Sequence, residues 1–121
     1  MKFSESLKKK EQFKNVYEHG VSYADRFIVM YVLENHLKMN RLGISVSKKV
    51  GNSVVRHRFV RLVRENYRLE EDDYMCGYDV VVIGRMPAAK ADFHRIGRSM
   101  KKLAEMHGII RSTGDHADQE A

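Results

Sequence analysis

The segment Ser47–Glu65, SKKVGNSVVRHRFVRLVRE, restricts the possible folds of this chain more than any other stretch. Six of its residues are Lys or Arg, and only Glu65 carries the opposite charge. Apolar residues recur through the same segment at helical spacing, at Val55, Phe59, Leu62 and Val63. This spacing predicts a helix with one apolar side, which must pack against a sheet or another helix. Any fold of the chain must therefore bury one side of a cationic helix.

The cationic side of this predicted helix lies opposite its apolar side. At about 100° per residue, the residues that fall there are His57, Arg61, Arg64 and Arg68. Arg58 lies beside them, and Arg56 lies in the first turn, where it can lean out past the helix end. Exposed helix faces usually mix Lys with Glu four residues away, so that the charges offset one another. Here nearly all the charge is arginine, which grips phosphate with two parallel hydrogen bonds, and the pattern favours a phosphate-binding surface over a solvated face.

The start of the helix extends this surface. Lys48 and Lys49 precede Gly51, where the chain can turn and a ligand can come near, and Asn52 or Ser53 is a suitable N-cap. The free amides and positive dipole end of a helix start bind phosphate readily. The net charge of +6 over 121 residues agrees with a polyanionic partner, either nucleic acid or an acidic membrane surface.

The first half of the chain predicts a helix followed by strands. Residues 7–20 have Phe13, Val16 and Tyr17 on one face, and Gly20 is placed to end the helix in a left-handed conformation. Residues 26–34 alternate between two faces, as a strand does, and a short extra strand is expected at 21–24. A hairpin-like connection at 34–40 leads to a second strand at 41–47, whose Gly and Ser residues leave room for a close neighbour.

The second half predicts a strand between two helices. The cationic helix should end near residue 69, before an acidic loop at 70–77. The apolar run Val80–Ile83 indicates a strand buried on both faces, and Pro87 breaks the chain before a last helix at 91–108. The order αββ(β)αβα gives an α+β fold with three helices and a single small mixed sheet. Residues 1–108 form this domain, and 109–121 form a polar tail that we expect to be disordered.

Other kinds of site find little support. The single cysteine, Cys76, excludes a disulfide within the chain and indicates a reducing, cytoplasmic location. We see no signal peptide, no membrane-spanning run and no glycine-rich phosphate loop. The histidines are scattered without the spacing of metal ligands or of a catalytic site. The acidic cluster Glu70–Asp73 can attract a divalent cation, but a solvated loop beside a basic helix is the simpler interpretation.

Three aromatic residues leave two interpretations open. Phe13 and Tyr17 lie four residues apart on one predicted helix face, and Tyr31 lies on a predicted strand. Core packing is the usual role of such residues. The alternative is a stacking platform for unpaired bases, which needs exposed rings beside positive charge.

The central motif resembles that of the protein subunit of bacterial ribonuclease P. In that family a strand ends in S-K-K-x-G-N, and a helix follows with R-N-R-x-x-R-x-x-R. Here the corresponding stretch reads SKKVGNSVVRHRFVRLVR, with His57 in place of the usual Asn and Val60 in place of a frequent Lys. The segments LKKKEQFKNVYEHG, RFIVMYVLE and YDVVVIGRMPAA also match, so the resemblance extends to about Gly108.

This resemblance implies a function and a set of site residues. In the family, a catalytic RNA hydrolyses precursor tRNA with Mg²⁺ to release the 5′ leader, and one protein per RNA, not itself catalytic, assists. By matched position, the residues toward the catalytic RNA would be Lys48, Lys49, Asn52, Arg56, Arg58, Arg61 and Arg64. The residues of a cleft for the leader would be Phe13, Tyr17, Tyr31 and Arg85. The family also implies a left-handed crossover through the cationic helix, where such connections are normally right-handed.

Two other classes of function stay open from the residues alone. One is a structural RNA-binding protein of the ribosomal type, with no role in cleavage. The other is a protein-only nuclease, against which the lack of paired carboxylates for a metal site counts. Neither a membrane nor a small-molecule substrate is expected.

Overall fold

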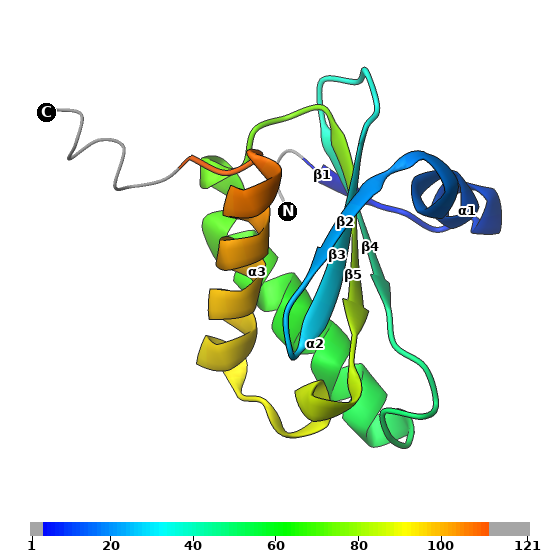
Figure 1. The fold of residues 1–121 in the computed structure, drawn as a ribbon, viewed down its shortest axis with the longest axis vertical. Coiled ribbons are helices and arrows are strands. Elements are labelled where there is room, and N and C mark those ends of the chain that lie inside the picture. The colour runs from blue at the N-terminus through cyan, green and yellow to red at the C-terminus, as the bar shows by residue number, and fades with distance from the viewer. Residues whose placement is uncertain (1–3, 112–121) are drawn as a thin grey trace, which may run out of the picture.

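The computed structural model describes residues 4–111 and contains three α-helices and a five-stranded sheet over that range (Figure 1). The strands are β1 (Ser4–Ser6), β2 (Val21–Ala24), β3 (Ile28–Glu34), β4 (Asn40–Ser45) and β5 (Tyr78–Gly84). The helices are α1 (Lys10–His19), α2 (Ser53–Glu70) and α3 (Phe93–His107), with short 3₁₀ helices at Glu71–Asp73 and Met86–Lys90. The predicted α+β class is confirmed, including the short strand before β3, whereas β1 was not predicted.

Strand β5 lies at the centre of the sheet, whose order is β1-β4-β5-β3-β2. It pairs in parallel with β4 and antiparallel with β3. Helix α2 therefore connects two neighbouring parallel strands, as expected for the crossover. The prediction of a hairpin-like connection at 34–40 was wrong, because β5 lies between the two strands that this segment joins. In β5, the apolar residues Val80 to Val82 are nearly inaccessible to solvent, which makes this strand suited to the central position.

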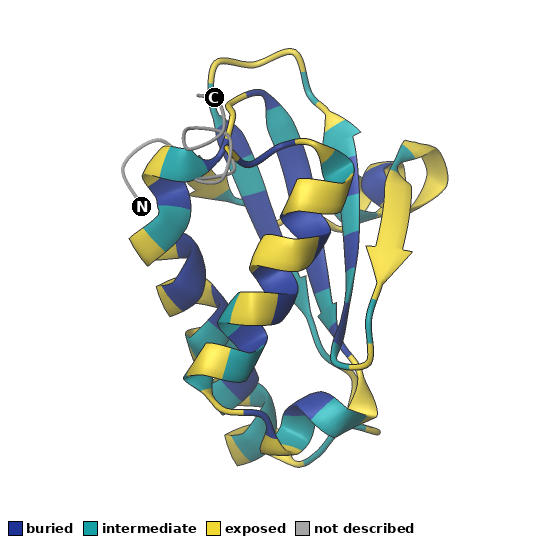
Figure 2. Ribbon diagram, turned by 60° about the vertical axis from the view of Figure 1, so that its left-hand side comes forward, coloured by how far each residue is buried: buried dark blue, intermediate teal, exposed yellow. Residues whose placement is uncertain are grey.

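Helices cover both faces of the sheet, α2 and α3 on one face and α1 on the other (Figure 1). The larger core lies between the sheet and α2 and α3, where Val80 and Val82 meet Phe59 and Ile96. A smaller core forms under α1, around Val81. Figure 2 shows that α3 is buried along its inner side and exposed along its outer side. The predicted burial of β5 on both faces is thus confirmed.

The acidic segment after α2 is more than a solvated loop, which corrects that expectation. Glu71 is only 3% exposed, and its carboxylate accepts a hydrogen bond of 2.7 Å from the Ser4 hydroxyl. The Tyr67 hydroxyl lies 2.7 Å from the same Ser4 oxygen. These contacts tie β1 to the end of α2. Among residues 4–111, no group of three or more His, Cys, Asp or Glu side chains is arranged to hold a metal ion.

The packed part of the chain continues past Gly108. Ile109 and Ile110 are 1% and 7% exposed, and Ile110 forms a β-bridge with Tyr74. The predicted tail at 109–121 therefore begins too early, because two apolar residues directly after the helix cap fold back onto the core. The remaining part of that prediction, 112–121, lies outside the described residues.

Gly20 ends α1, but not in the left-handed conformation predicted for it. Its φ angle is −83°, and a Cβ there would lie 2.6 Å from the Val16 carbonyl oxygen and 3.0 Å from that of Val32. Glycine is required because carbonyl oxygens of both α1 and β3 come too close for a side chain. The left-handed cap occurs instead at Gly108, where φ is 74° and a Cβ would have no neighbour within 4 Å.

Substitution by asparagine should affect the free energy of unfolding differently at these two glycines. Asparagine enters the left-handed region more readily than most residues, so Gly108→Asn should cost less than about 1 kcal/mol of unfolding free energy. Gly20→Asn should cost about 1–3 kcal/mol, as overpacking does, because fixed backbone oxygens occupy the space of its Cβ. Urea unfolding of the two variants measures the difference. Equal losses would contradict the steric explanation for Gly20.

Candidate nucleic-acid interface

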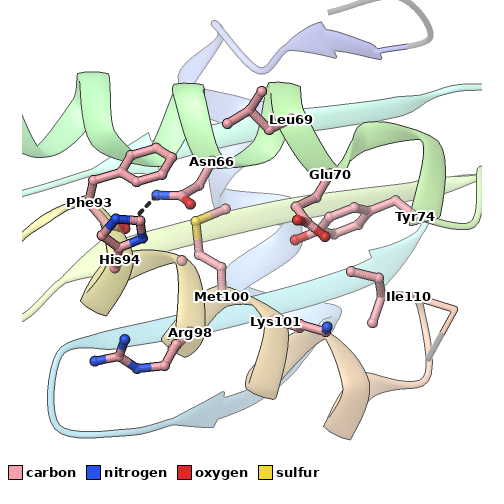
Figure 3. A pocket seen from close by; sticks show the side chains of 11 residues that line it. Asn66, Leu69, Glu70, Tyr74, Phe93, His94, Arg98, Met100, Lys101 and Ile110 are labelled. Carbon is pink, nitrogen blue, oxygen red and sulfur yellow. Dashed lines mark hydrogen bonds between the residues drawn. The ribbon is translucent and has the colours of Figure 1, made fainter. Parts of the chain in front are cut away.

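Helix α2 is held firmly by the contacts of its inner side. Phe59, Val63 and Tyr67 are each at most 1% exposed. Figure 3 shows Asn66 of α2 reaching toward Phe93 of α3, where its amide donates a hydrogen bond of 3.0 Å to the Phe93 carbonyl. The opposite side of α2 is thereby fixed in its orientation toward solvent.

A row of cations occupies that opposite side. Its exposed members are His57, Arg61, Arg64 and Arg68, and its half-buried flanks are Arg56 and Arg58. Arg68 is engaged by Glu65 through two hydrogen bonds, which lower the pKa of that carboxyl. No salt bridge found within residues 4–111 involves the other four arginines. We call these four the arginine surface: Arg56, Arg58, Arg61 and Arg64.

The start of α2 continues the positive charge. Asn52 is the N-cap, and its side-chain oxygen accepts a hydrogen bond of 3.0 Å from the Val55 amide. Lys48 and Lys49 are both exposed just before it. A Cβ at Gly51 would lie 2.7 Å from the Val55 Cβ. This glycine therefore lets the turn pack onto the helix, a role distinct from the ligand approach that the sequence suggested.

The three aromatic side chains come together between α1 and the sheet. The Phe13 and Tyr17 ring centroids are 6.3 Å apart, and those of Tyr17 and Tyr31 are 5.1 Å apart, edge to face. Tyr17 is 39% exposed, whereas Phe13 and Tyr31 are half-buried. Phe13 packs directly over Gly43, where a Cβ would lie 2.7 Å from the ring. The rings thus support the smaller core with one side and remain accessible on the other.

Arg85 does not join these rings. It follows the end of β5, whereas Tyr31 pairs with Val81, four residues earlier and about 13 Å away along the strand. Its guanidinium donates a hydrogen bond of 2.6 Å to the Asp25 carbonyl, at the turn between β2 and β3. The expected leader-binding set is therefore divided in space, with the rings at one place and Arg85 at another.

An ion pair that was not predicted from the sequence lies on the same face of the sheet as the aromatic rings. Asp79 is fully buried and accepts two hydrogen bonds of 2.8 Å from the Arg41 guanidinium and one of 2.9 Å from Asn35. Hydrogen bonding to Asp79 raises the pKa of Arg41. The pair links β4 to β5. The only signal in the sequence was an acidic residue directly before an apolar run, which does not identify its partner.

Comparison with known proteins identifies the family to which this chain belongs. The family model for ribonuclease P matches residues 1–108. The chain belongs to the ribonuclease P family. It is 51% identical over 110 residues to the ribonuclease P protein component of Lachnoclostridium phytofermentans, a match that covers 91% of this chain and 95% of that relative.

Solved structures of ribonuclease P proteins have a similar fold. The protein from Staphylococcus aureus has a TM-score of 0.80 and 34% identity, over 88% of this chain and 97% of that one. The protein from Thermotoga maritima has a TM-score of 0.77 and 27% identity, over 84% of this chain and 96% of that one. The resemblance found in the sequence is confirmed over nearly the whole domain.

Ribonuclease P processes the 5′ end of tRNA, and the family's protein works in it together with an RNA subunit. The chain is accordingly a subunit of an endonuclease holoenzyme. The ribosomal-type alternative gains no support. No helix within residues 4–111 is long and apolar enough to cross a membrane.

The arginine surface can be tested through the salt dependence of binding to the RNA subunit. Arg61→Ala and Arg64→Ala should each lower the slope of log K against log salt by roughly 0.7–0.9, because each removes a cation that is free to meet a phosphate. Both side chains are exposed, so the unfolding free energy should change little.

The matched control removes the neighbouring ion pair. The double variant Glu65→Gln/Arg68→Gln deletes one anion and one cation together from the same helix face, and we expect an unchanged slope. Unchanged slopes for Arg61→Ala and Arg64→Ala as well would mean that this face meets only solvent.

Proposed function

We propose that the protein binds the catalytic RNA of ribonuclease P through the arginine surface and holds the 5′ leader of precursor tRNA against the aromatic rings. In this proposal one protein serves one RNA, the RNA carries the catalysis, and Mg²⁺ is bound mainly by the RNA. The observation that carries it is the arginine surface, whose four arginines form no salt bridge within residues 4–111, on a helix whose inner side is fully packed.

The packing of α2 supports the first part of this proposal. Arg58, Arg61 and Arg64 follow one another every three residues, which corresponds to a rise of about 4.5 Å along the helix axis. A rigid helix presents these guanidinium groups at fixed spacing before the RNA arrives, so less conformational entropy is lost on binding. Lys48, Lys49 and the amide of Asn52 would extend the same surface past the helix start.

The surroundings of the rings support the second part. Phe13 and Tyr17 line a hollow of about 480 Å³ on α1, together with two basic residues, Lys10 and Lys14, and one acidic residue, Glu11. Partly exposed rings beside cations suit unpaired nucleotides, since a base can stack on the ring while its phosphate meets the ammonium group. Arg85 lies apart from the rings, where it would meet a different nucleotide of the leader.

The role of the protein is then to position RNA and neutralise its charge. Arginine and lysine side chains lower the repulsion between two polyanions, and the aromatic rings select an unpaired strand over a duplex. The proposal assigns no catalytic step to a protein side chain. It places the protein in the cytoplasm, where the exposed thiol of Cys76 would remain reduced.

Comparing the binding of precursor tRNA and mature tRNA distinguishes a role of Tyr17 in leader binding from a role in the fold. Tyr17→Ala should weaken the binding of precursor tRNA to the holoenzyme by about 1–3 kcal/mol for each base that stacks on the ring. Binding of mature tRNA, which has no leader, should barely change. The affinities of both RNAs are measured with the same holoenzyme preparation. An equal loss for both RNAs would show that the ring serves the fold instead.

Reconstitution tests the proposed division of labour. The protein should restore cleavage of precursor tRNA by the cognate RNA at low Mg²⁺, where the RNA alone is slow, and the protein alone should not cleave. Gel analysis of the released leader measures both reactions. Robust cleavage by RNA-free protein, abolished by a point mutation in the protein, would overturn the assignment of catalysis to the RNA.

A further inference from the structure

A second group of cations lies outside the matched motif, where the 3₁₀ helix Met86–Lys90 leads into α3. A hollow of about 650 Å³ opens there. Its rim carries four basic side chains, those of Arg26, Lys90, Arg95 and Arg98. Its floor includes Phe27 and Pro87. Met86 also lines the hollow and is 66% exposed, so apolar surface is available at this place.

The floor of the hollow suits a flat, electron-rich group. The Arg95 guanidinium lies over the Phe27 ring, 4.8 Å from its centroid, and that of Arg26 lies 5.9 Å from the same centroid. The Nε atom of Arg95 is buried and has no hydrogen-bond partner among residues 4–111. A ligand at this place would meet the Phe27 ring and the guanidinium group stacked on it.

Among residues 4–111, the only acidic side chain that lines the hollow is already engaged. Asp92 is the N-cap of α3, and its carboxylate accepts a hydrogen bond of 2.8 Å from the Arg95 amide. That hydrogen bond is the main reason why the pKa of Asp92 is lowered, and the charges of Arg98 and Arg58 contribute less. Helix α2 packs against both the 3₁₀ helix Met86–Lys90 and α3, so the hollow adjoins the helix that carries the arginine surface.

We propose that this hollow binds one nucleotide of the RNA subunit, with a phosphate at the cationic rim and the base or ribose on the apolar floor. The inference rests on the proposed function, because it takes the RNA that meets α2 to continue onto the start of α3. Packing of α2 against the 3₁₀ helix and α3 favours the RNA subunit over the leader, although Arg85 directly precedes Met86 of the hollow. The aromatic rings lie under α1, which covers the other face of the sheet (Figure 1).

The first test measures the affinity of the RNA subunit over a range of salt, without tRNA. Lys90→Ala and Arg98→Ala remove exposed cations of the rim and leave the stacking of Arg95 on Phe27 in place. Each variant should lower the slope of log K against log salt by roughly 0.7–0.9, so the wild-type advantage shrinks about threefold between 50 and 200 mM salt. Lys38→Ala, at the opposite end of the molecule, makes the same change in charge and should leave the slope unaltered.

The outcomes separate this inference from the proposed function. Unchanged slopes for Lys90→Ala and Arg98→Ala, with lowered slopes for Arg61→Ala and Arg64→Ala, overturn the inference alone. Unchanged slopes for all four variants overturn both. An equal effect of Lys38→Ala overturns the inference, because net charge then explains the data. Weaker binding of precursor tRNA with unchanged affinity for the RNA subunit also overturns it.

A second test locates the contact. Ala89 lines the hollow, so a photoactivatable crosslinker attached through Ala89→Cys would report which RNA lies over it. The experiment uses a Cys76→Ser background, because the native thiol is exposed. We expect crosslinks to the RNA subunit in the holoenzyme, reduced several-fold when Lys90→Ala and Arg98→Ala are combined with it. Crosslinks to the tRNA leader alone, or none above the background variant, would overturn the inference.

Discussion

The burial of one side of α2 against the sheet is the interaction on which the rest of this protein depends. Phe59, Val63 and Tyr67 are almost inaccessible, and full burial of a large apolar side chain stabilises a fold by about 1.5–3 kcal/mol. Repulsion between like charges one turn apart on a helix costs only about 0.2–0.5 kcal/mol per pair. Packing therefore wins by a wide margin. It holds the four arginines of the arginine surface in place, although no acidic side chain within residues 4–111 forms a salt bridge with any of these four.

The central position of β5 lets one sheet support two different surfaces. Val80 and Val82 belong to the core beneath α2 and α3, whereas Val81 belongs to the core beneath α1. The arginine surface and the aromatic rings are thus fixed relative to each other through a single strand. The buried pair of Arg41 and Asp79 links that strand to β4, and breaking such a pair leaves an uncompensated buried charge. A rigid scaffold of this kind suits the proposed binding of two RNAs at once.

Features that depend on neighbours in the chain could be predicted from the sequence, and features that depend on distant segments could not. The arginine helix follows from periodicity and charge within one segment. The separation of β3 from β4 depends on β5, which comes more than thirty residues later in the chain, and the burial of Glu71 depends on Ser4. Gly20 was assigned to the wrong cause, because the space of a Cβ there is occupied by the Val16 carbonyl oxygen of α1 and, less tightly, by that of Val32 in β3. Arg85 was grouped with the rings by family position, although the strand register separates them.

The central claim is that the outer side of α2 faces the RNA subunit in the assembled enzyme. Directed hydroxyl-radical cleavage tests it most directly, with an iron chelate attached at position 57, between Arg56 and Arg58, through His57→Cys in a Cys76→Ser background. His57 is exposed on the cationic side of α2, so the attachment should not disturb the core. The account predicts strong, localised cleavage of the RNA subunit backbone in the holoenzyme. Cleavage no stronger than that from a chelate on the exposed side of α1, or confined to the tRNA, would contradict it.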